Sequence, residues 1–172
     1  RVEEAATLAR EARGIDAAHA VGEALADADV PLPPNIAARW GYVTPWQIIG
    51  PFPNPRGQAF GRPFLDEARG PRAGPVTFLG DTYAWRPATA SGLPAWLALD
   101  AGGTPQVYYA AAEVAVEEVA AATLHLGATG GVELLYAGGP VYTQATALTG
   151  TPGEVRVPVV LSPGRNQILV KL

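Results

Sequence analysis

The stretch that decides the fold, residues 107–136, reads VYYAAAEVAVEEVAAATLHLGATGGVELLY. Its first part has apolar side chains at every second position from Tyr108 to Val116, with Glu113 and Glu117 at the positions between or after them. Alternation of this kind is typical of a strand with one buried face and one solvated face. The stretch therefore predicts a half-buried strand at its start.

Two further strands follow in the same stretch. Leu124 and Leu126 repeat the alternation, and so do Val132 and Leu134. The GATGG segment at 127–131 has the composition of a turn. Because such short connections are too short for parallel crossovers, the sequence predicts an antiparallel meander.

The size of the chain indicates one domain with an appendage. It has 172 residues and no cysteine, so neither a disulfide nor a thiolate metal site can form. No apolar run is long enough for a transmembrane helix or a signal peptide. The sequence begins at Arg1, from which we expect a processed or trimmed product.

Charge is unevenly distributed along the chain. Residues 1–30 carry seven acidic and three basic side chains, and residues 31–172 carry nine of each, so the formal charge of −4 lies in the N-terminal segment. No basic stripe of the kind that binds nucleic acid is present in the sequence. We therefore expect no nucleic-acid partner.

Three regions differ in composition. Residues 1–30 have the apolar spacing of two short helices, at 2–13 and from Asp16 to about Ala28, and form an N-terminal helical segment. Residues 31–45 form a Pro-rich connector. Residues 46–172 form the β domain, which includes a long Pro/Arg loop at 53–75.

The β domain contains further strand signals on both sides of the central stretch. Strands are predicted from Trp46 to Gly50, within 76–85 around a turn at Gly80-Asp81, from Val155 to Leu161 and over 166–172, the last two joined as a hairpin. Pro158 cannot donate to a strand ladder, which indicates an edge or a bulge. About eight strands with such turns are typical of an antiparallel two-sheet β-sandwich or jelly roll.

Four segments carry a resemblance to a known family. They are WQIIGPFPN at 46–54, YAWRP at 83–87, the segment 107–141 and VRVPVVLSPGRNQILVKL at 155–172. In this order they resemble the galactose-binding-like β-sandwich modules of secreted multidomain bacterial proteins. The resemblance implies a jelly-roll domain that is extracytoplasmic, periplasmic or secreted.

This sequence departs from the family pattern at two turns. Where adjacent aspartates often follow the Leu-x-Leu-Gly strand, the chain has Ala-Thr-Gly-Gly at 128–131. Where an Asn-Gly turn often follows an aromatic strand, it has Ala-Gly-Gly-Pro at 137–140. Both changes remove polar side chains that could hold a sugar or a cation.

No constellation of residues indicates catalysis. His19 and His125 are the only histidines, and each lacks an evident partner in the sequence. Glu117 and Glu118 are adjacent, so on a strand they would point to opposite faces and could not flank one bond. Because no nucleophile motif, metal motif or phosphate loop is present either, we expect no enzyme activity, no cofactor and no metal.

Aromatic residues allow two interpretations. They could build a platform on which a sugar stacks, or they could simply pack the core and the edges of the sandwich. The residues concerned are Trp40, Trp46, Trp85, Trp96, Tyr42, Tyr83, Tyr108 and Tyr109.

The Pro/Arg loop is the strongest candidate for a binding surface. Arginine and aromatic residues are enriched at protein interfaces, and a long ordered loop usually has a function, although the loop could also be merely solvated. The predicted partner-binding residues are Phe52, Arg56, Phe60, Arg62, Phe64, Arg69 and Arg72.

We therefore expect a non-catalytic protein-interaction module, an accessory or structural subunit of a larger extracytoplasmic or membrane-associated assembly. The alternatives are a carbohydrate-binding module and the non-catalytic end domain of a secreted enzyme. The same strand assignments predict seven largely buried side chains: Trp46, Trp85, Val114, Val116, Leu124, Leu126 and Leu134.

Overall fold

The structure is a computed structural model that describes residue 17, residues 20–22, 24–25, 36–92, 95–100 and 102, and residues 104–172. The chain is mainly β. It divides into two compact units, one of residues 1–45 and 89–98 and the other of residues 46–88 and 99–172.

The first unit contains the described helical residues. Ala17, residues 20–22, Ala24 and Leu25 are helical, with Leu25 buried, as the predicted second helix requires. The predicted helix at 2–13 lies outside the described residues. The Pro-rich connector contains a short helix that was not expected, α3 (Ile36–Arg39), and Trp40 directly after it is buried.

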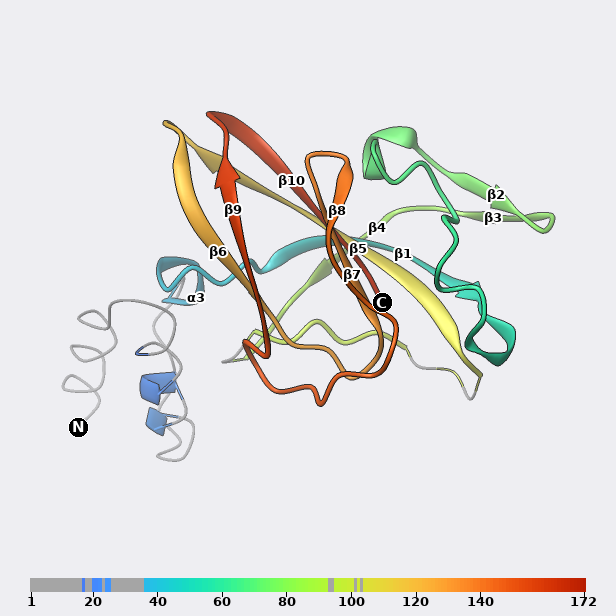
Figure 1. The fold of residues 1–172 in the computed structure, drawn as a ribbon, viewed down its shortest axis with the longest axis horizontal. Helices are drawn as coiled ribbons and strands as arrows, with labels where there is room; N and C mark the ends of the chain where they lie inside the picture. The colour runs from blue at the N-terminus through green and yellow to red at the C-terminus, as the bar shows by residue number, and fades with distance from the viewer. Residues whose placement is uncertain are drawn as a thin grey trace. The chain divides into compact units, whose positions relative to one another are not determined.

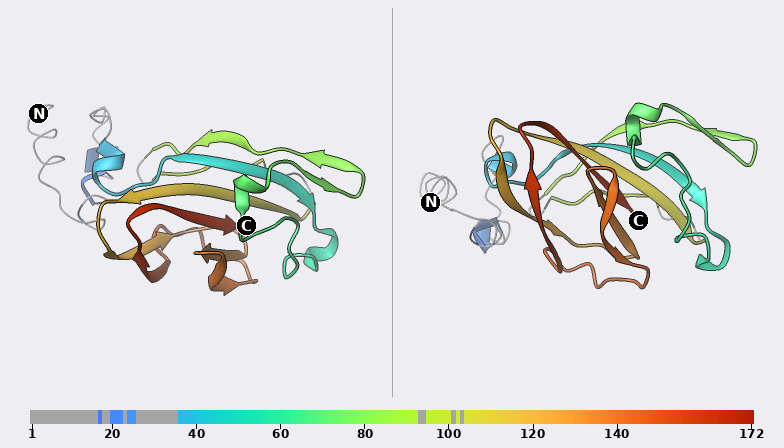
Figure 2. Two further views of the ribbon diagram at one scale, coloured as in Figure 1. Left: turned by 90° about the horizontal axis from the view of Figure 1, so that it is seen from above. Right: turned by 45° about the horizontal axis from the view of Figure 1, so that its top comes forward.

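The described residues form ten strands (Figure 1). These are β1 (Pro45–Pro53), β2 (Val76–Phe78), β3 (Asp81–Tyr83), β4 (Arg86–Thr89), β5 (Gln106–Val116), β6 (Ala120–Leu126), β7 (Val132–Tyr136), β8 (Gly139–Gln144), β9 (Val155–Leu161) and β10 (Gly164–Lys171). They make one six-stranded sheet in the order β4-β1-β5-β10-β7-β8 and two two-stranded sheets, β2-β3 and β6-β9. The three long strands β1, β5 and β10 run side by side in the large sheet (Figure 2).

The predicted meander is wrong. β5 pairs with β1 and β10, β6 pairs with β9, and β7 pairs with β10 and β8, so β5, β6 and β7 are not neighbours. The predicted hairpin of β9 and β10 is wrong for the same reason, because the two strands belong to different sheets. Turn composition showed where the chain reverses, but it carried no information on which sheet each strand joins.

A folded two-stranded ribbon replaces the meander. Val116 faces Gly164 at one end of the β5-β10 ladder, and Ala120 faces Leu161 at the start of the β6-β9 ladder. Both strands of the ribbon therefore change direction within a few residues. Figure 1 shows the corners between β5 and β6 and between β9 and β10. The folded part brings β6 and β9 onto one face of the large sheet.

Each face of the large sheet has its own core. On one face, β6 and β9 pack onto β7 and β10 through residues that include Val157, Val132 and Ile168. On the other face, the loop at 54–75 and the β2-β3 hairpin cover β1 and β5, around Phe52 and Tyr109. Val107 to Ala112 are consequently buried on both faces, and the prediction of one solvated face holds only from Glu113 onward.

The predicted core is partly correct. Leu134 is buried, but Trp46, Trp85, Val114, Val116, Leu124 and Leu126 are only half-buried. The parity of Leu124 and Leu126 is right, because both pack against the core under β6 and β9. They stay partly accessible because this layer has only two strands.

Two predictions about single segments, a hairpin and the end of the first strand, can also be compared with the structure. The hairpin within 76–85 is confirmed, but its turn is Leu79-Gly80, one residue before the predicted Gly80-Asp81, and Asp81 already pairs with Phe78. Leu79 and Gly80 both have positive φ, as a two-residue turn of the primed type requires. The first strand, expected to end at Pro51, continues to Pro53, because an irregularity between Ile49 and Phe52 lets pairing resume at Val107.

Candidate functional site

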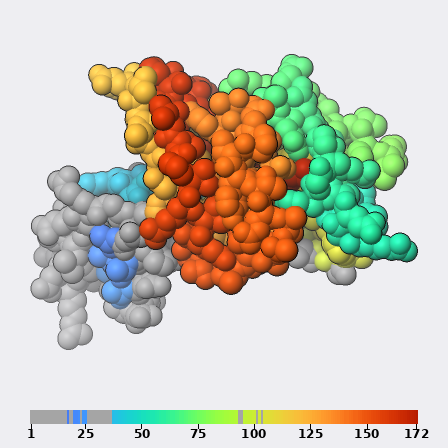
Figure 3. Space-filling model, viewed as in Figure 1, coloured from blue at the N-terminus to red at the C-terminus, as the bar shows by residue number. Residues whose placement is uncertain are grey.

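The loop between β1 and β2 carries the candidate site, and aromatic packing fixes its path. Phe64 stacks on Phe52 with ring centroids 5.0 Å apart, and Phe78 of β2 meets Phe64 edge-on, also at 5.0 Å. Such ring pairs contribute about 0.5–1.5 kcal/mol each beyond the apolar area they bury. The loop, which contains the 3-10 helices Pro55–Gly57 and Gly70–Ala73, is therefore anchored in the core by Phe60 and Phe64, although most of its other residues are exposed. It forms a continuous surface beside the β2-β3 hairpin (Figure 3).

Asn54 fixes the start of the loop. Its side chain is buried, and its Oδ1 accepts a hydrogen bond from the amide of Ala59 at 2.7 Å. Its own amide donates to the carbonyl of Pro105 at 3.1 Å. The first turn of the loop is thus tied both to itself and to the segment that leads into β5.

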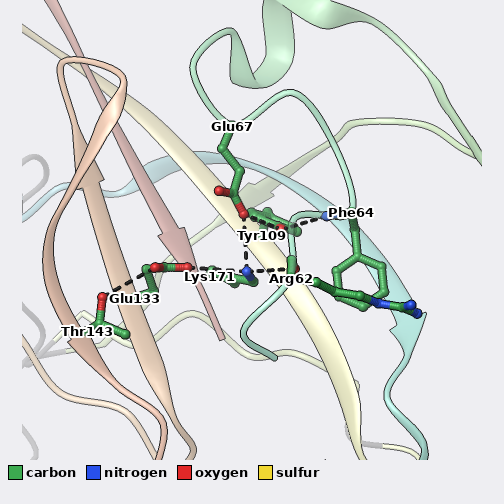
Figure 4. A network of polar contacts seen from close by, with 7 residues as sticks. All are labelled: Arg62, Phe64, Glu67, Tyr109, Glu133, Thr143 and Lys171. Carbon is green, nitrogen blue, oxygen red and sulfur yellow. Dashed lines mark hydrogen bonds and ion pairs between the residues drawn. The ribbon is translucent and has the colours of Figure 1, made fainter. Parts of the chain in front are cut away.

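Lys171 fixes the middle of the loop. Its side chain is 1% exposed and comes from the last strand, β10. Nζ donates to the carbonyl of Arg62 at 2.9 Å and lies 3.2 Å from carboxylate oxygens of both Glu67 and Glu133 (Figure 4). It also lies over the rings of Phe60 and Tyr109 at 5.4 and 5.6 Å. One amine therefore joins two points of the loop to the sheet.

Tyr109 of β5 completes this network. Its hydroxyl donates to Glu67 at 2.7 Å and accepts a hydrogen bond from the amide of Phe64 at 3.2 Å (Figure 4). Burial, together with the hydrogen bond to Glu67, raises the pKa of Tyr109 far above its usual range. The neutral hydroxyl is the form that holds the loop.

The charges of the network do not balance. Lys171 faces the two carboxylates of Glu67 and Glu133, and Glu133 also accepts a hydrogen bond from Thr143. A buried charge that loses its only partner costs about 3–5 kcal/mol, whereas the intact pair contributes much less. The network therefore specifies the position of the loop more than it adds to the stability of the sheet.

The predicted partner-binding residues separate into two groups. Phe52, Phe60 and Phe64 are buried in the core, so the structure gives them a packing role and removes them from any exposed surface. Their spacing in the sequence, each close to an arginine, gave no indication of which side chains turn inward. The other predicted residues, Arg56, Arg62, Arg69 and Arg72, are all exposed.

The arginines are held in different ways. The Arg62 guanidinium lies over the rings of Phe64 and Phe78, at 5.2 and 5.3 Å from their centroids. Arg72 and Arg165 share the carboxylate of Glu113, at 3.4 and 3.0 Å. We call the four exposed arginines that are spread along the loop, from its first 3-10 helix to its second, the arginine surface: Arg56, Arg62, Arg69 and Arg72.

A shallow depression of about 590 Å³ lies beside the start of the loop. Its polar lining includes Arg56, Asp81, Tyr83 and Gln106, and its rim is rich in proline. Arg56 adopts a left-handed conformation with φ 61°, which is uncommon for a residue other than glycine and is found disproportionately at functional sites.

The other predicted candidates are not assembled into a site. His125 is half-buried on β6 opposite Arg156, and His19 lies outside the described residues. Glu117 and Glu118 are both exposed at the corner after β5 and do not lie on a strand. In the part of the chain that the structure describes, no group of three or more His, Asp or Glu side chains could hold a metal.

The predicted platform residues differ in how exposed they are. Tyr108 and Tyr109 are buried, and the Tyr108 hydroxyl donates to the carbonyl of Asp100 at 2.6 Å. Trp96 is exposed, whereas Tyr83 is half-buried against Phe52. Among the described residues, Tyr83 is the aromatic side chain that lines the depression.

Sequence reasoning missed the residues that hold the loop. One signal was available in the sequence, a lysine at the end of a hydrophobic strand. Lys171 is on the same side of that strand as Leu169, and a sheet covered on both faces buries this side. Glu67 and Tyr109 gave no such signal. Their partners are 104 and 42 residues away in the chain, at positions that only the fold brings together.

Comparison of the chain with protein-family models, with curated proteins and with solved structures finds no match. None of the described helices has the length and apolar character needed to cross a membrane.

Proposed function

We propose that the chain is a non-catalytic protein-interaction module, an accessory subunit of an extracytoplasmic assembly, built on a jelly-roll domain of the galactose-binding-like type. The observation that carries the proposal is the arginine surface on a loop that is held from below by buried contacts. The folded ribbon of β5-β6 and β9-β10 supports the jelly-roll topology.

The charge of the loop favours an acidic partner. Residues 54–75 contain four arginines against Asp66 and Glu67. Glu67 is turned toward Lys171, which leaves Asp66 as the exposed acidic side chain of the loop. The arginine surface is therefore basic on a chain whose formal net charge is −4. Complementary charge increases the rate and the specificity of association.

The rigidity of the loop favours binding as well. Ordering a flexible loop on association costs about 0.5–1.5 kcal/mol for each immobilised side chain. The packing of Phe60 and Phe64 and the bonds of Lys171 order the loop backbone before any partner arrives. More of the interaction energy then remains for binding.

Photo-crosslinking in the source cells tests the proposal. A photoreactive residue at position 69 on the arginine surface should give one discrete protein adduct, and the same residue at position 160 on the outer face of β9 should give none. The adduct at 69 should weaken as salt is raised, because screening reduces interactions between exposed charges. Equal adducts at both positions, or none at 69, would contradict the proposal.

A charge-matched pair of variants separates the surface from net charge. Because position 69 is itself substituted in the triple variant Arg56→Ser, Arg62→Ser and Arg69→Ser, the photoreactive residue is placed at position 72. This triple variant should no longer form the protein adduct. The control triple variant Arg39→Ser, Arg86→Ser and Arg156→Ser removes the same charge elsewhere and should keep it. Loss of the adduct in both triple variants would show that binding responds to net charge alone.

A second function is favoured by the depression beside the loop. A carbohydrate-binding module needs an apolar face for the sugar ring and polar groups for its hydroxyls. Tyr83 with the proline rim could supply the first, and Arg56, Asp81 and Gln106 the second. Binding on a panel of neutral and acidic polysaccharides that Asp81→Ala and Tyr83→Ala both abolish would favour this function. Binding that neither substitution changes would exclude the depression.

A further inference from the structure

We propose that Lys171 is a positioning residue of the arginine surface, and that its buried amine joins the loop to the sheet at Arg62 and Glu67, in addition to the packing of Phe60 and Phe64. Only the expected effect of Lys171 on partner binding rests on the proposed function. The placement of the loop can be tested without any partner.

The contacts of Lys171 support this role, because its one side chain binds both the loop and a neighbouring strand. Nζ binds the carbonyl of Arg62 and the carboxylate of Glu67 from the loop, and the carboxylate of Glu133 from the sheet (Figure 4). Lys171 and Glu133 face each other directly in the β10-β7 ladder, so their backbone positions are fixed by strand pairing. The loop is the partner that can move.

Removing the Lys171 amine would replace its attraction for the two carboxylates by a repulsion between the carboxylates. With Lys171→Met, the carboxylates of Glu67 and Glu133 would face each other without the cation that both now contact. Glu133 is held by its strand, so the repulsion acts on Glu67 and on the loop that carries it. Strand pairing uses backbone groups, so the sheet itself should persist.

Cleavage by trypsin reports the position of the loop. The Arg69 side chain is exposed, but the next residue, Gly70, is buried, and its amide donates to Asp66 at 2.9 Å. A protease needs an extended segment, so this bond should resist cleavage until the loop opens. The Arg62 bond gives no signal, because Pro63 follows it and trypsin does not cut there.

The expected result is selective. Lys171→Met should raise the rate of cleavage after Arg69 by about tenfold or more, as expected for a local opening, with the β-sheet circular dichroism retained. Adding Glu67→Gln and Glu133→Gln to Lys171→Met should restore protection, because neutral amides remove the repulsion and still form hydrogen bonds. The control Glu118→Gln, which changes an exposed carboxylate at the corner after β5, should leave the rate unchanged.

Two outcomes would overturn the proposal. The first is an unchanged cleavage rate in a folded Lys171→Met variant. The second is a raised rate that the two glutamine substitutions do not lower, which would show that repulsion between the two carboxylates does not displace the loop. If Lys171→Met does not fold, Lys171→Gln, which also removes the cation, replaces it, and an unchanged rate of cleavage after Arg69 in that variant would contradict the proposal.

The binding readout separates this inference from the proposed function. If the loop opens in Lys171→Met and the adduct at position 69 is lost and then restored by the two glutamine substitutions, both stand. If cleavage behaves as expected but no adduct forms in the unmodified chain, the inference stands and the proposed function fails. Unchanged cleavage together with a salt-sensitive adduct at position 69 would support the proposed function and overturn the role of Lys171.

Discussion

At the scale of single residues, buried polar side chains of the β domain determine how the chain turns. Asn166 is buried where β10 begins, and its Nδ2 donates to the carbonyls of Ser162 at 2.8 Å and Gly164 at 3.2 Å. Its Oδ1 accepts from the Ser162 amide at 2.9 Å and from the Tyr136 hydroxyl at 2.8 Å. An amide is the side chain that offers both donors and an acceptor to these groups.

Asn166→Ala should destabilise the protein by about 1–3 kcal/mol, because buried backbone groups at the corner lose their partners. Asn166→Asp should cost at least as much, since a carboxylate oxygen would then face the carbonyls that Nδ2 now contacts. Urea unfolding measures the change. A cost below about 0.5 kcal/mol for both variants would mean that water replaces the amide.

Tyr109 should make stability depend on alkaline pH. Its pKa is raised in the folded state above the ordinary value of 10.0, so folding favours the protonated hydroxyl. The stabilisation is therefore complete below about pH 10 and is lost as pH rises above it. Urea unfolding at pH 9 and at pH 11 should show this loss, and Tyr109→Phe should show less of it. An identical loss in Tyr109→Phe would assign the effect to other groups.

At the scale of elements, alternation along a strand determines what faces the core. In β9 the residues Val155, Val157, Val159 and Leu161 are buried, and Arg156, Pro158 and Val160 between them are exposed, which confirms the predicted alternation. Because β9 lies in a two-stranded sheet, Pro158 is also at an edge, as predicted. Val160 is 62% exposed although it is as apolar as its neighbours. The layer formed by β6 and β9 has an inner face in the core and an outer face in solvent.

Two neighbouring valines test this assignment. Val159→Thr places a hydroxyl among apolar side chains and should destabilise the protein by about 1–3 kcal/mol. Val160→Thr changes an exposed side chain in the same strand and should stay within about 0.5 kcal/mol of the parent chain. Thermal unfolding of the two variants gives the comparison. Equal effects would indicate that the outer face is covered in solution.

At the scale of the whole molecule, opposite charges lie in separate parts of the sequence. Residues 1–30 carry the formal net charge of −4, and the Arg-rich loop lies within the remaining, neutral part. A protein of this kind can bind a polyanion locally although its total charge is negative, because screening limits each interaction to about 8–10 Å.

Heparin chromatography at low salt tests the charge separation, with heparin used only as a polyanionic probe. The chain should be retained, and the triple variant at Arg56, Arg62 and Arg69 should elute at lower salt. The control triple variant at Arg39, Arg86 and Arg156 has the same net charge and should elute close to the parent chain. The same shift in both triple variants would mean that heparin responds only to net charge.

The sequence alone determined most of the strand-forming segments, though not β4 and β8, and the inward side of several of them. Alternating residues in 124–126, 132–136 and 155–161 specify a buried face, because side chains of a strand point to opposite sides in turn. It also determined the loop at 53–75 and the four arginines on it. These features are local, so they can be recognised without knowledge of neighbouring strands.

Only the tertiary structure decided which strands are neighbours and which loop residues are accessible. The pairing of β5 with β10 joins positions about fifty residues apart, such as Glu113 and Gln167, and no local pattern encodes that distance. The same contacts turn Phe60 and Phe64 inward and leave the arginines outside. Lys171 became significant for the same reason: its partners, Arg62, Glu67 and Glu133, come from two segments that meet only when the sheet is complete.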